Sequence, residues 1–254
     1  MPSSSPVFSA AGWREAAGLF RRSQPVTPAM VALAVTIPLY LVIAGIVHGG
    51  PVHVPAIELD RMIPVQAAWA PVYLSLFLAA LLPAFVLHQP ELIERTVRAY
   101  LAAWLAAYVF FLAYPTLSPR PESTTGDGFT AWMLRTIWAS DVRYNCFPSL
   151  HVAQCFIAAL ACHRVHTGVG NAALAWAAAV SLSTLFTKQH YVADVLGGIV
   201  LAGLAYAAFI RPFPRDATPE KQRRLAPTLA FAAALAYGVL VAGMWIAYRC
   251  GVEI

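Results

Sequence analysis

The sequence predicts an all-α protein, a polytopic bundle of transmembrane helices. Of its 254 residues, 59% are hydrophobic and only 11% are charged, whereas a soluble domain carries about 25% charged residues. The apolar residues occur in runs close to the roughly 20 residues that a helix needs to cross a bilayer. Because so few charges cannot cover a water-soluble surface, one membrane bundle explains the length better than one or two soluble domains do.

Seven such runs follow one another along the chain, and the fourth and fifth are the shortest. They lie near Met30 to Val47, Gln66 to Leu87, Val97 to Tyr114, Cys146 to Cys162, Asn171 to Thr187, His190 to Ile210, and Pro227 to Tyr248. Pro38 and Pro83 should kink or break their spans, which membrane helices tolerate when neighbours satisfy the freed backbone groups. The expected organisation is a cytoplasmic segment 1–27, a six-helix catalytic membrane domain 28–210, a cytoplasmic linker 211–225, and a seventh helix with a short tail 226–254.

The distribution of Lys and Arg predicts how the bundle is oriented, because cytoplasmic loops retain positive charge. One alternating set of loops holds eleven of these residues, and the other set holds six, Arg61, Arg120, Arg135, Arg143, Lys188 and Arg249. The N-terminus should therefore be cytoplasmic and the C-terminus extracytoplasmic, as in an integral protein of a bacterial inner membrane. We expect no removable signal peptide. The net charge of +5 is then a topology signal, and no basic stripe interleaved with aromatics suggests nucleic-acid binding.

The cysteines and histidines show no metal-binding spacing. Cys146, Cys155, Cys162 and Cys250 form no CxxC pair, so buried or idle thiols are the preferred interpretation, and a bridge between Cys146 and Cys250 stays open. The sequence offers no carboxylate cluster for Mg²⁺ and no Cys/His set for zinc. We therefore expect neither a metal nor another cofactor.

Three polar segments lie at the ends of spans predicted to face the outside. They are Tyr114 to Pro121, Phe147 to His151, and Thr187 to Asp194. Ionisable residues at a membrane edge are costly unless they serve a function. The fourth span runs inward from His151 and the fifth returns outward, so His190 should lie at the depth of His151. The segment between the first two, from Ser118 to Tyr144, is polar enough to be an ordered or partly mobile lid.

A nucleophile with its supporting groups is the chemistry these residues offer. His190 and Asp194 are four residues apart, hence on one face of a helix. The carboxylate can hold the imidazole in one tautomer and leave its other nitrogen free to attack a phosphate. His151 can then donate the proton of the leaving group, because the pKa of imidazole lies near working pH. A buried polar network that only pins three helices is the alternative.

Two further residues could bind phosphate oxygens. Arg120 could grip them in a bidentate way, and Ser149 with backbone N–H groups at the start of the fourth helix could add donors. Arg120 could instead be a topology or headgroup arginine. Ser149 could serve equally as a helix N-cap.

The ordered motifs resemble those of the type 2 phosphatidic acid phosphatase superfamily. Arg120-Pro121 is similar to the RP of its first motif, Pro148-Ser149-Leu150-His151 to the second motif PSGH, and Ser183, His190 and Asp194 to the third. The resemblance covers about residues 97–205. It implies a six-helix phosphatase-type core and the same roles: His190 as nucleophile, Asp194 as its support, and His151 as the acid.

Two motif cations are missing, which bears on the substrate. Ala113 stands where the first-motif lysine would fall, and Thr184 where the third-motif arginine would fall. The strings FPSLH and STLFTKQHYVADVLGG are more similar to the branch of inositol phosphorylceramide and sphingomyelin synthases, which transfer a phospho-headgroup between lipids. Lys188 could replace a lost cation, although a lysine at a membrane edge is also a common snorkelling anchor.

The sequence thus predicts a metal-independent lipid phosphatase or phosphotransferase of the membrane. It would cleave a lipid-linked phosphate ester through a phosphohistidine and pass the phosphoryl group or phospho-headgroup to water or to a lipid hydroxyl. Hydrolase and transferase share the first half-reaction, so the motifs leave the acceptor, the lipid and the oligomeric state open. The alternative function is a non-catalytic transporter or binder of anionic lipid headgroups.

Overall fold

The computed structural model describes residues 8–20, 25–122 and 126–252, and these ranges are helical without a β-strand. An isolated bridge pairs His53 with Thr116. The helices are α1 (Ala10–Phe20), α2 (Pro28–Thr36), α3 (Leu39–Val47), α4 (Glu58–Met62), α5 (Ala70–Leu74), α6 (Leu76–Val86), α7 (Pro90–Ala113), α8 (Phe129–Ser140), α9 (Leu150–Val165), α10 (Thr167–Phe186), α11 (Val192–Ala205) and α12 (Glu220–Arg249). The predicted all-α class is confirmed.

Helices stand at all seven predicted membrane positions. Six continuous or paired helices are long and apolar enough to cross a bilayer: Pro28–Val47, Ala67–Val86, Pro90–Ala113, Thr167–Phe186, Val192–Ile210 and Glu220–Arg249. The remaining one, α9, is apolar but has 16 residues. It packs against α6, α7, α10 and α11, and most of its residues are buried. A helix surrounded by protein need not match the bilayer thickness, so the short length fits an integral membrane bundle.

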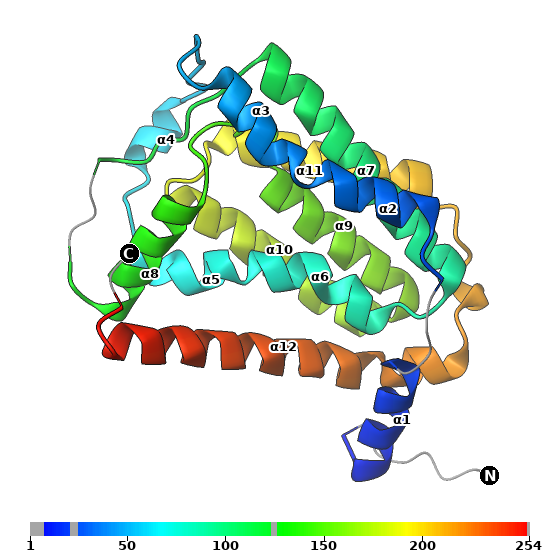
Figure 1. Cartoon of the computed structure of the whole chain (residues 1–254). Helices are drawn as coiled ribbons and strands as arrows, with labels where there is room; N and C mark the ends of the chain where they lie inside the picture. Colours follow the sequence, from blue (N-terminus) through cyan, green and yellow to red (C-terminus); the bar gives the residue numbers. More distant parts are fainter. Residues whose placement is uncertain (1–7, 21–24, 123–125, 253–254) are drawn as a thin grey trace.

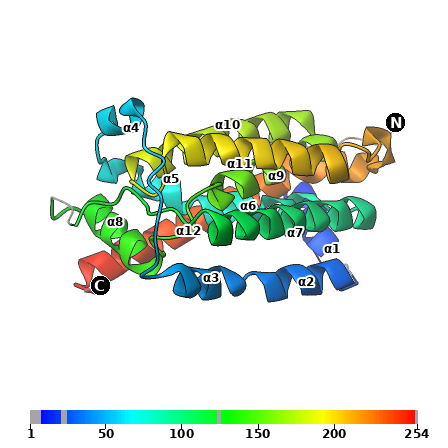
Figure 2. The same ribbon diagram turned by 90° about the horizontal axis from the view of Figure 1, so that it is seen from above.

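The two ends of the bundle carry different short helices. In Figure 1, α4, α8 and the C-terminus lie at one end, and α1 lies at the other. We call these the outer and inner ends, following the predicted topology. Viewed from above, α2 and α3 form one margin of the bundle and α10 the opposite one (Figure 2). Both α9 and α11 begin at the outer end, and this arrangement determines where the functional residues gather.

Proline residues interrupt the spans at one of the two predicted places. The first span is broken at Pro38, since α2 ends at Thr36 and α3 begins at Leu39. Pro83 lies within α6, which continues through it. The interruption of that span lies at Ser75, between α5 and α6.

The inner end is more helical than its polar composition suggested. Within the expected cytoplasmic segment, α1 packs Ala16 and Leu19 against Leu225 and Leu229 of α12. The helix α12 begins at Glu220, inside the stretch 211–225 expected to be a linker. Burial of Leu225 against α1 supplies the apolar contact that an isolated helical turn would lack.

The predicted topology can be tested with the native thiols. Cys250 is exposed near the outer end of α12, whereas the other three cysteines are buried. All four lie in the described residues and are free thiols, so the bridge between Cys146 and Cys250 is absent here. A membrane-impermeant maleimide should therefore label wild-type protein in intact cells at Cys250.

A matched variant reports on the inner end. Asp216 is exposed in the loop before α12, and Asp216→Cys combined with Cys250→Ser should be labelled only after the cells are permeabilised. The reverse labelling pattern would place α4 and α8 in the cytoplasm.

Candidate active site

His151, His190 and Asp194 meet at the outer end of the bundle. His151 is the second residue of α9, His190 precedes α11, and Asp194 lies in the first turn of α11. Nδ1 of His151 is 3.2 Å from Nε2 of His190, and Nδ1 of His190 is 3.3 Å from Oδ2 of Asp194. The structure thus brings the three predicted catalytic residues into one hydrogen-bonded chain, with His190 and Asp194 buried.

The contact between His190 and Asp194 arises from a helix cap and not from one helix face. The helix α11 begins at Val192, so His190 lies in the preceding loop. Oδ2 of Asp194 accepts the backbone N–H of Tyr191 at 2.9 Å and so caps the start of α11, and the same oxygen lies 3.3 Å from Nδ1 of His190. Asp60 of α4 adds a second cap, because its Oδ1 accepts the N–H of Val192 at 2.8 Å.

Glycines let α11 approach the start of α9 closely. A Cβ added at Gly198 would lie 2.5 Å from the carbonyl oxygen of Ser149, and one at Gly197 would lie 2.9 Å from the ring of Phe147. The N–H of Ser149 donates to the carbonyl oxygen of Asp194 at 3.0 Å. Any side chain at Gly198 would push these backbones apart, so the two glycines fix the spacing between the two histidine-bearing segments.

Arg120 is buried, with a side-chain exposure of 3%, and its guanidinium is saturated by protein acceptors. Nε donates to Oε1 of Gln189 at 3.0 Å, and one Nη donates to the carbonyl oxygens of Trp138 and Asp141 at 3.2 and 2.8 Å. The other Nη donates to the carbonyl oxygen of Val142 at 3.1 Å and again to Gln189. The predicted phosphate contact would need the release of one or more of these bonds, and it stays a prediction.

Ser149 and Lys188 are also engaged with protein groups. Oγ of Ser149 accepts the N–H of Val152 at 3.3 Å as the N-cap of α9. Nζ of Lys188 donates to the carbonyl oxygen of Asp60 at 3.1 Å, and partial burial lowers the pKa of this amine. Among the described contacts none joins either side chain to the histidines, so their phosphate-binding roles also stay predictions.

The structure shows the surroundings of the two positions at which the resembled motifs carry a cation. Ala113 is the exposed last residue of α7. Thr184 is fully buried, and its hydroxyl donates to the carbonyl oxygen of Ser181 at 2.7 Å. Its own carbonyl oxygen accepts the N–H groups of Gln189 and His190. Thr184 therefore supports the loop that carries His190, and an arginine side chain would have to displace buried neighbours.

Sequence reasoning missed an acidic residue beside the histidines. Asp141 ends α8, and its Oδ2 accepts the hydroxyl of Tyr73 at 3.1 Å while its Oδ1 accepts that of Tyr40 at 3.4 Å. The Tyr73 hydroxyl also lies 3.4 Å from Nδ1 of His151, and Oδ2 of Asp141 lies 3.4 Å from Arg120. Asp141 thus connects Arg120 to His151 through Tyr73. No motif distinguished it, because a lone acid in a polar loop is ordinarily a solvated residue.

The expected lid is an ordered helix over half of its described length. Between Ser118 and Tyr144 lies α8, whose buried residues are Ala131, Met133, Leu134 and Ile137. Nε1 of Trp138 donates to the carbonyl oxygen of Thr187 at 2.8 Å. Residues 123–125 lie outside the described part of the chain. The segment therefore covers the loop that carries His190.

The part of the chain that carries this site is similar in sequence to known proteins. A family model described as the PAP2 superfamily matches residues 56–208, more than half of the chain and all of the histidine site. The chain belongs to the PAP2 superfamily. A PA-phosphatase related-family protein of Dictyostelium discoideum is 22% identical to this superfamily member over 136 residues, which cover 47% of the chain and 25% of that protein. The chain thus spans about a quarter of the length of this relative. No solved structure matches.

One cluster in this PAP2 chain has metal-ligand spacing among the described residues. Cys146, His190 and Asp194 each offer one ligand atom, all within 4.8 Å of one another. A thiol must lose its proton to bind a metal. Burial, with the Asp194 carboxylate nearby, raises the pKa of Cys146, which opposes that loss. The donor set therefore fits a metal poorly, and a metal there would engage the predicted nucleophile.

Turnover by this PAP2 protein is accordingly expected to be unchanged after EDTA treatment, measured as release of phosphate from a lipid phosphate. The matched control is Cys146→Ser, which should behave as wild type with and without the chelator. Loss on chelation that one divalent ion restores, together with an inactive Cys146→Ser, would instead assign the cluster as a required metal site.

Proposed function

We propose that this PAP2-superfamily member cleaves a lipid-linked phosphate ester through a phosphohistidine on His190 and transfers the phosphoryl group or phospho-headgroup to water or a lipid hydroxyl. The observation that carries the proposal is the chain from Asp194 through His190 to His151, with contacts of 3.3 and 3.2 Å. A buried network serving stability alone would not need two titratable rings facing one another, one of which, His151, borders a cavity.

The first half-reaction follows from the hydrogen-bond directions. An ionised Asp194 can only accept, so the proton of His190 resides on Nδ1 and leaves Nε2 with a lone pair. Nε2 attacks phosphorus, the N–P bond forms, and the P–O bond to the lipid breaks. His151, which enters this step as the imidazolium, donates its Nδ1 proton to the departing oxygen and becomes neutral. Asp194 stabilises the positive charge that builds on His190.

The second half-reaction reverses the proton transfer. Neutral His151 takes a proton from water or from a lipid hydroxyl as that oxygen attacks phosphorus. The N–P bond then breaks and His190 is regenerated. Both acceptors use the same residues, so the choice between hydrolase and transferase depends on which hydroxyl reaches this position.

The two rings must separate before a substrate can react. At 3.2 Å between nitrogens, no phosphorus fits between them, because reacting atoms alone need about 3–3.5 Å. The glycine contact holds the backbones of α9 and α11, so side-chain movement must provide the space. His151 borders a cavity of about 390 Å³, and Tyr73 at its edge can accept or donate a hydrogen bond to the displaced ring.

A substrate panel with purified full-length protein tests the proposal. Phosphatidic acid, an isoprenyl diphosphate and headgroup-donor phospholipids would each be supplied with and without ceramide or diacylglycerol. Product that forms only with a lipid hydroxyl would assign a transferase of the kind the FPSLH string resembles, and free phosphate would assign a hydrolase. If every substrate were bound or moved across the membrane but none was converted, the transporter or binder would replace our proposal.

A further inference from the structure

Two apolar cavities adjoin along one face of α6. The outer one, of about 390 Å³, reaches from His151 to Ala80 and Leu81. The inner one, of about 370 Å³, starts at the same two residues and continues to His88. Because both cavities use Ala80 and Leu81 as wall, we treat them as one groove, the α6 groove, between α6 on one side and α2, α3 and α7 on the other.

The outer end of the α6 groove is polar and lies at the proposed catalytic residues. Tyr40, Tyr73, Asp141 and His151 all line it. Below them the lining becomes apolar, with Phe77 and Trp104 among the larger side chains. A ligand that fills the groove would therefore present a polar group to His151 and hydrocarbon to the remainder.

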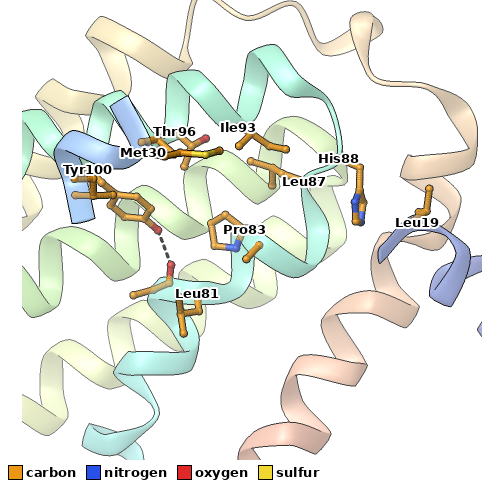
Figure 3. A pocket seen from close by; sticks show the side chains of 13 residues that line it. Leu19, Met30, Leu81, Pro83, Leu87, His88, Ile93, Thr96 and Tyr100 are labelled. Carbon is orange, nitrogen blue, oxygen red and sulfur yellow. Dashed lines mark hydrogen bonds between the residues drawn. The ribbon is translucent and has the colours of Figure 1, made fainter. Parts of the chain in front are cut away.

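The inner part of the groove accepts only hydrocarbon. None of its described lining residues is charged, and its polar side chains bond to backbone carbonyl oxygens. The Tyr100 hydroxyl donates to Ala80 at 2.7 Å and the Thr96 hydroxyl to Leu92 at 2.7 Å, and Nε2 of His88 lies 3.0 Å from the oxygen of Phe85. Figure 3 shows this region, with Leu19 of α1 and His88 at the end away from Tyr100.

The length of the groove matches one lipid chain. Along the second span the lining runs from Tyr73 to Leu87, a stretch that extends on the order of 22 Å at about 1.5 Å per residue. This is most of the roughly 30 Å hydrocarbon core of a bilayer, so the groove can take one long hydrocarbon chain in an extended form. Leu81 and Ala84 are exposed along this face, so a chain can enter sideways from the bilayer.

We propose that the α6 groove holds the hydrocarbon chain of the phosphate-bearing substrate and that its inner end, at Leu19 and His88, limits the chain length. The proposal rests on the proposed function, since it takes His151 as the position of the phosphate. The occupant that we assign to the groove is the donor lipid, which carries the phosphate. A bound structural lipid or the chain of the acceptor is an alternative that the tests below separate.

Photolabelling tests the location of the chain without needing turnover. The probe is a 16-carbon alkyl phosphate with a diazirine at the chain end, added to full-length His190→Ala protein in phosphatidylcholine nanodiscs. Labels are expected on the inner lining, around Met30 and Leu33 of α2 and around Ala84 to Leu87 at the inner end of α6. The matching alcohol without phosphate should label lipid-facing helices such as α12 as well. The same broad pattern for both probes would overturn the proposal.

Kinetics with a chain-length series tests the limit. For monomeric alkyl phosphates, kcat/KM should rise by up to about fourfold per buried methylene and then level off once the groove is filled. Ala84→Trp, at the exposed inner lining, should lower kcat/KM by about tenfold or more for a 16-carbon chain, which corresponds to the burial of a few methylenes, and leave a short chain nearly unchanged. The matched control is Ala236→Trp on α12, exposed and outside the groove, which should resemble wild type.

The outcomes separate this inference from the proposed function. If the wild-type protein converts no phosphate ester but the phosphate probe still labels the inner lining, the reaction is wrong and the chain site stands. If the protein is active but Ala84→Trp lowers kcat/KM equally for short and long chains, the reaction stands and the chain site is wrong. If a ceramide photoprobe labelled the same residues in the absence of any phosphate lipid, the groove would hold the acceptor, and our assignment of it to the donor lipid would be overturned.

Discussion

Replacing His190 with alanine should abolish turnover of every lipid phosphate, by about 10⁴- to 10⁶-fold, as expected for loss of a nucleophile. It should also abolish labelling of the protein when the reaction is quenched during turnover of a ³²P-labelled substrate, because no N–P bond can form. Asp194→Asn should keep the cap on the Tyr191 N–H through its amide oxygen. Its rate should fall by up to about 10⁴-fold, because the negative charge that stabilises the imidazolium of His190 is lost.

The matched control for these variants is His53→Ala. His53 is an exposed histidine at the same end of the bundle, stacked on Tyr114, and it makes no described contact with His151 or His190. It should keep nearly wild-type activity. Maleimide labelling that stays confined to Cys250 while the three buried cysteines remain unreactive, together with unchanged chromatographic behaviour, would show that each variant is folded. A folded His190→Ala protein with wild-type turnover would end the proposed mechanism.

Replacing His151 with alanine should affect the reaction according to the leaving group. On a natural alkyl phosphate the loss should be about 10²- to 10⁴-fold, the usual contribution of general acid catalysis. On an aryl phosphate, whose oxygen departs as a stable anion, the first step should be much less affected. The 3.2 Å contact also disappears, so the nucleophile becomes easier to reach.

A burst experiment separates the two steps of this variant. With an aryl phosphate, His151→Ala should release phenolate in a rapid burst and then turn over slowly, because no base remains to activate the second acceptor. Tyr73→Phe, which removes only the hydroxyl near His151, is the conservative comparison and should show a smaller loss on both substrates. Equal losses of His151→Ala on alkyl and aryl esters would argue that His151 binds phosphate and is not the acid.

The fold was largely predictable because hydrophobicity dictates it. Apolar runs of membrane length marked the seven positions, and the central α9 was found even though it is short. Elements that depend on tertiary contacts were not predicted: α4 and α8 have polar flanks, and α1 becomes helical where Leu19 meets α12. For the same reason Pro38 broke its span and Pro83 did not, since each outcome depends on neighbours that the sequence does not display.

The site, like the fold, was predicted from the sequence only in part. His151, His190 and Asp194 carry motif spacing, and the depth argument brought them together correctly. The cap that positions Asp194, in which its carboxylate accepts the N–H of Tyr191, however, required knowledge of where α11 begins. Asp141 and Gln189 were missed because their importance lies only in their partner, Arg120, whose guanidinium they bind. Polar networks that join distant segments leave no periodicity by which a sequence could reveal them.

The close contact at Gly198 has a consequence for how the protein is made. During synthesis α9 leaves the ribosome about 40 residues before α11, and His151 then enters the bilayer without its partner. Because Gly198 has no side chain, α11 can pack directly against the backbone at Ser149. The site is therefore completed only when α11 inserts. A nascent chain interrupted between His190 and Asp194 would carry both histidines and yet lack the carboxylate and the two glycines. Such an unfinished chain would lack the support for His190 that the proposed mechanism requires.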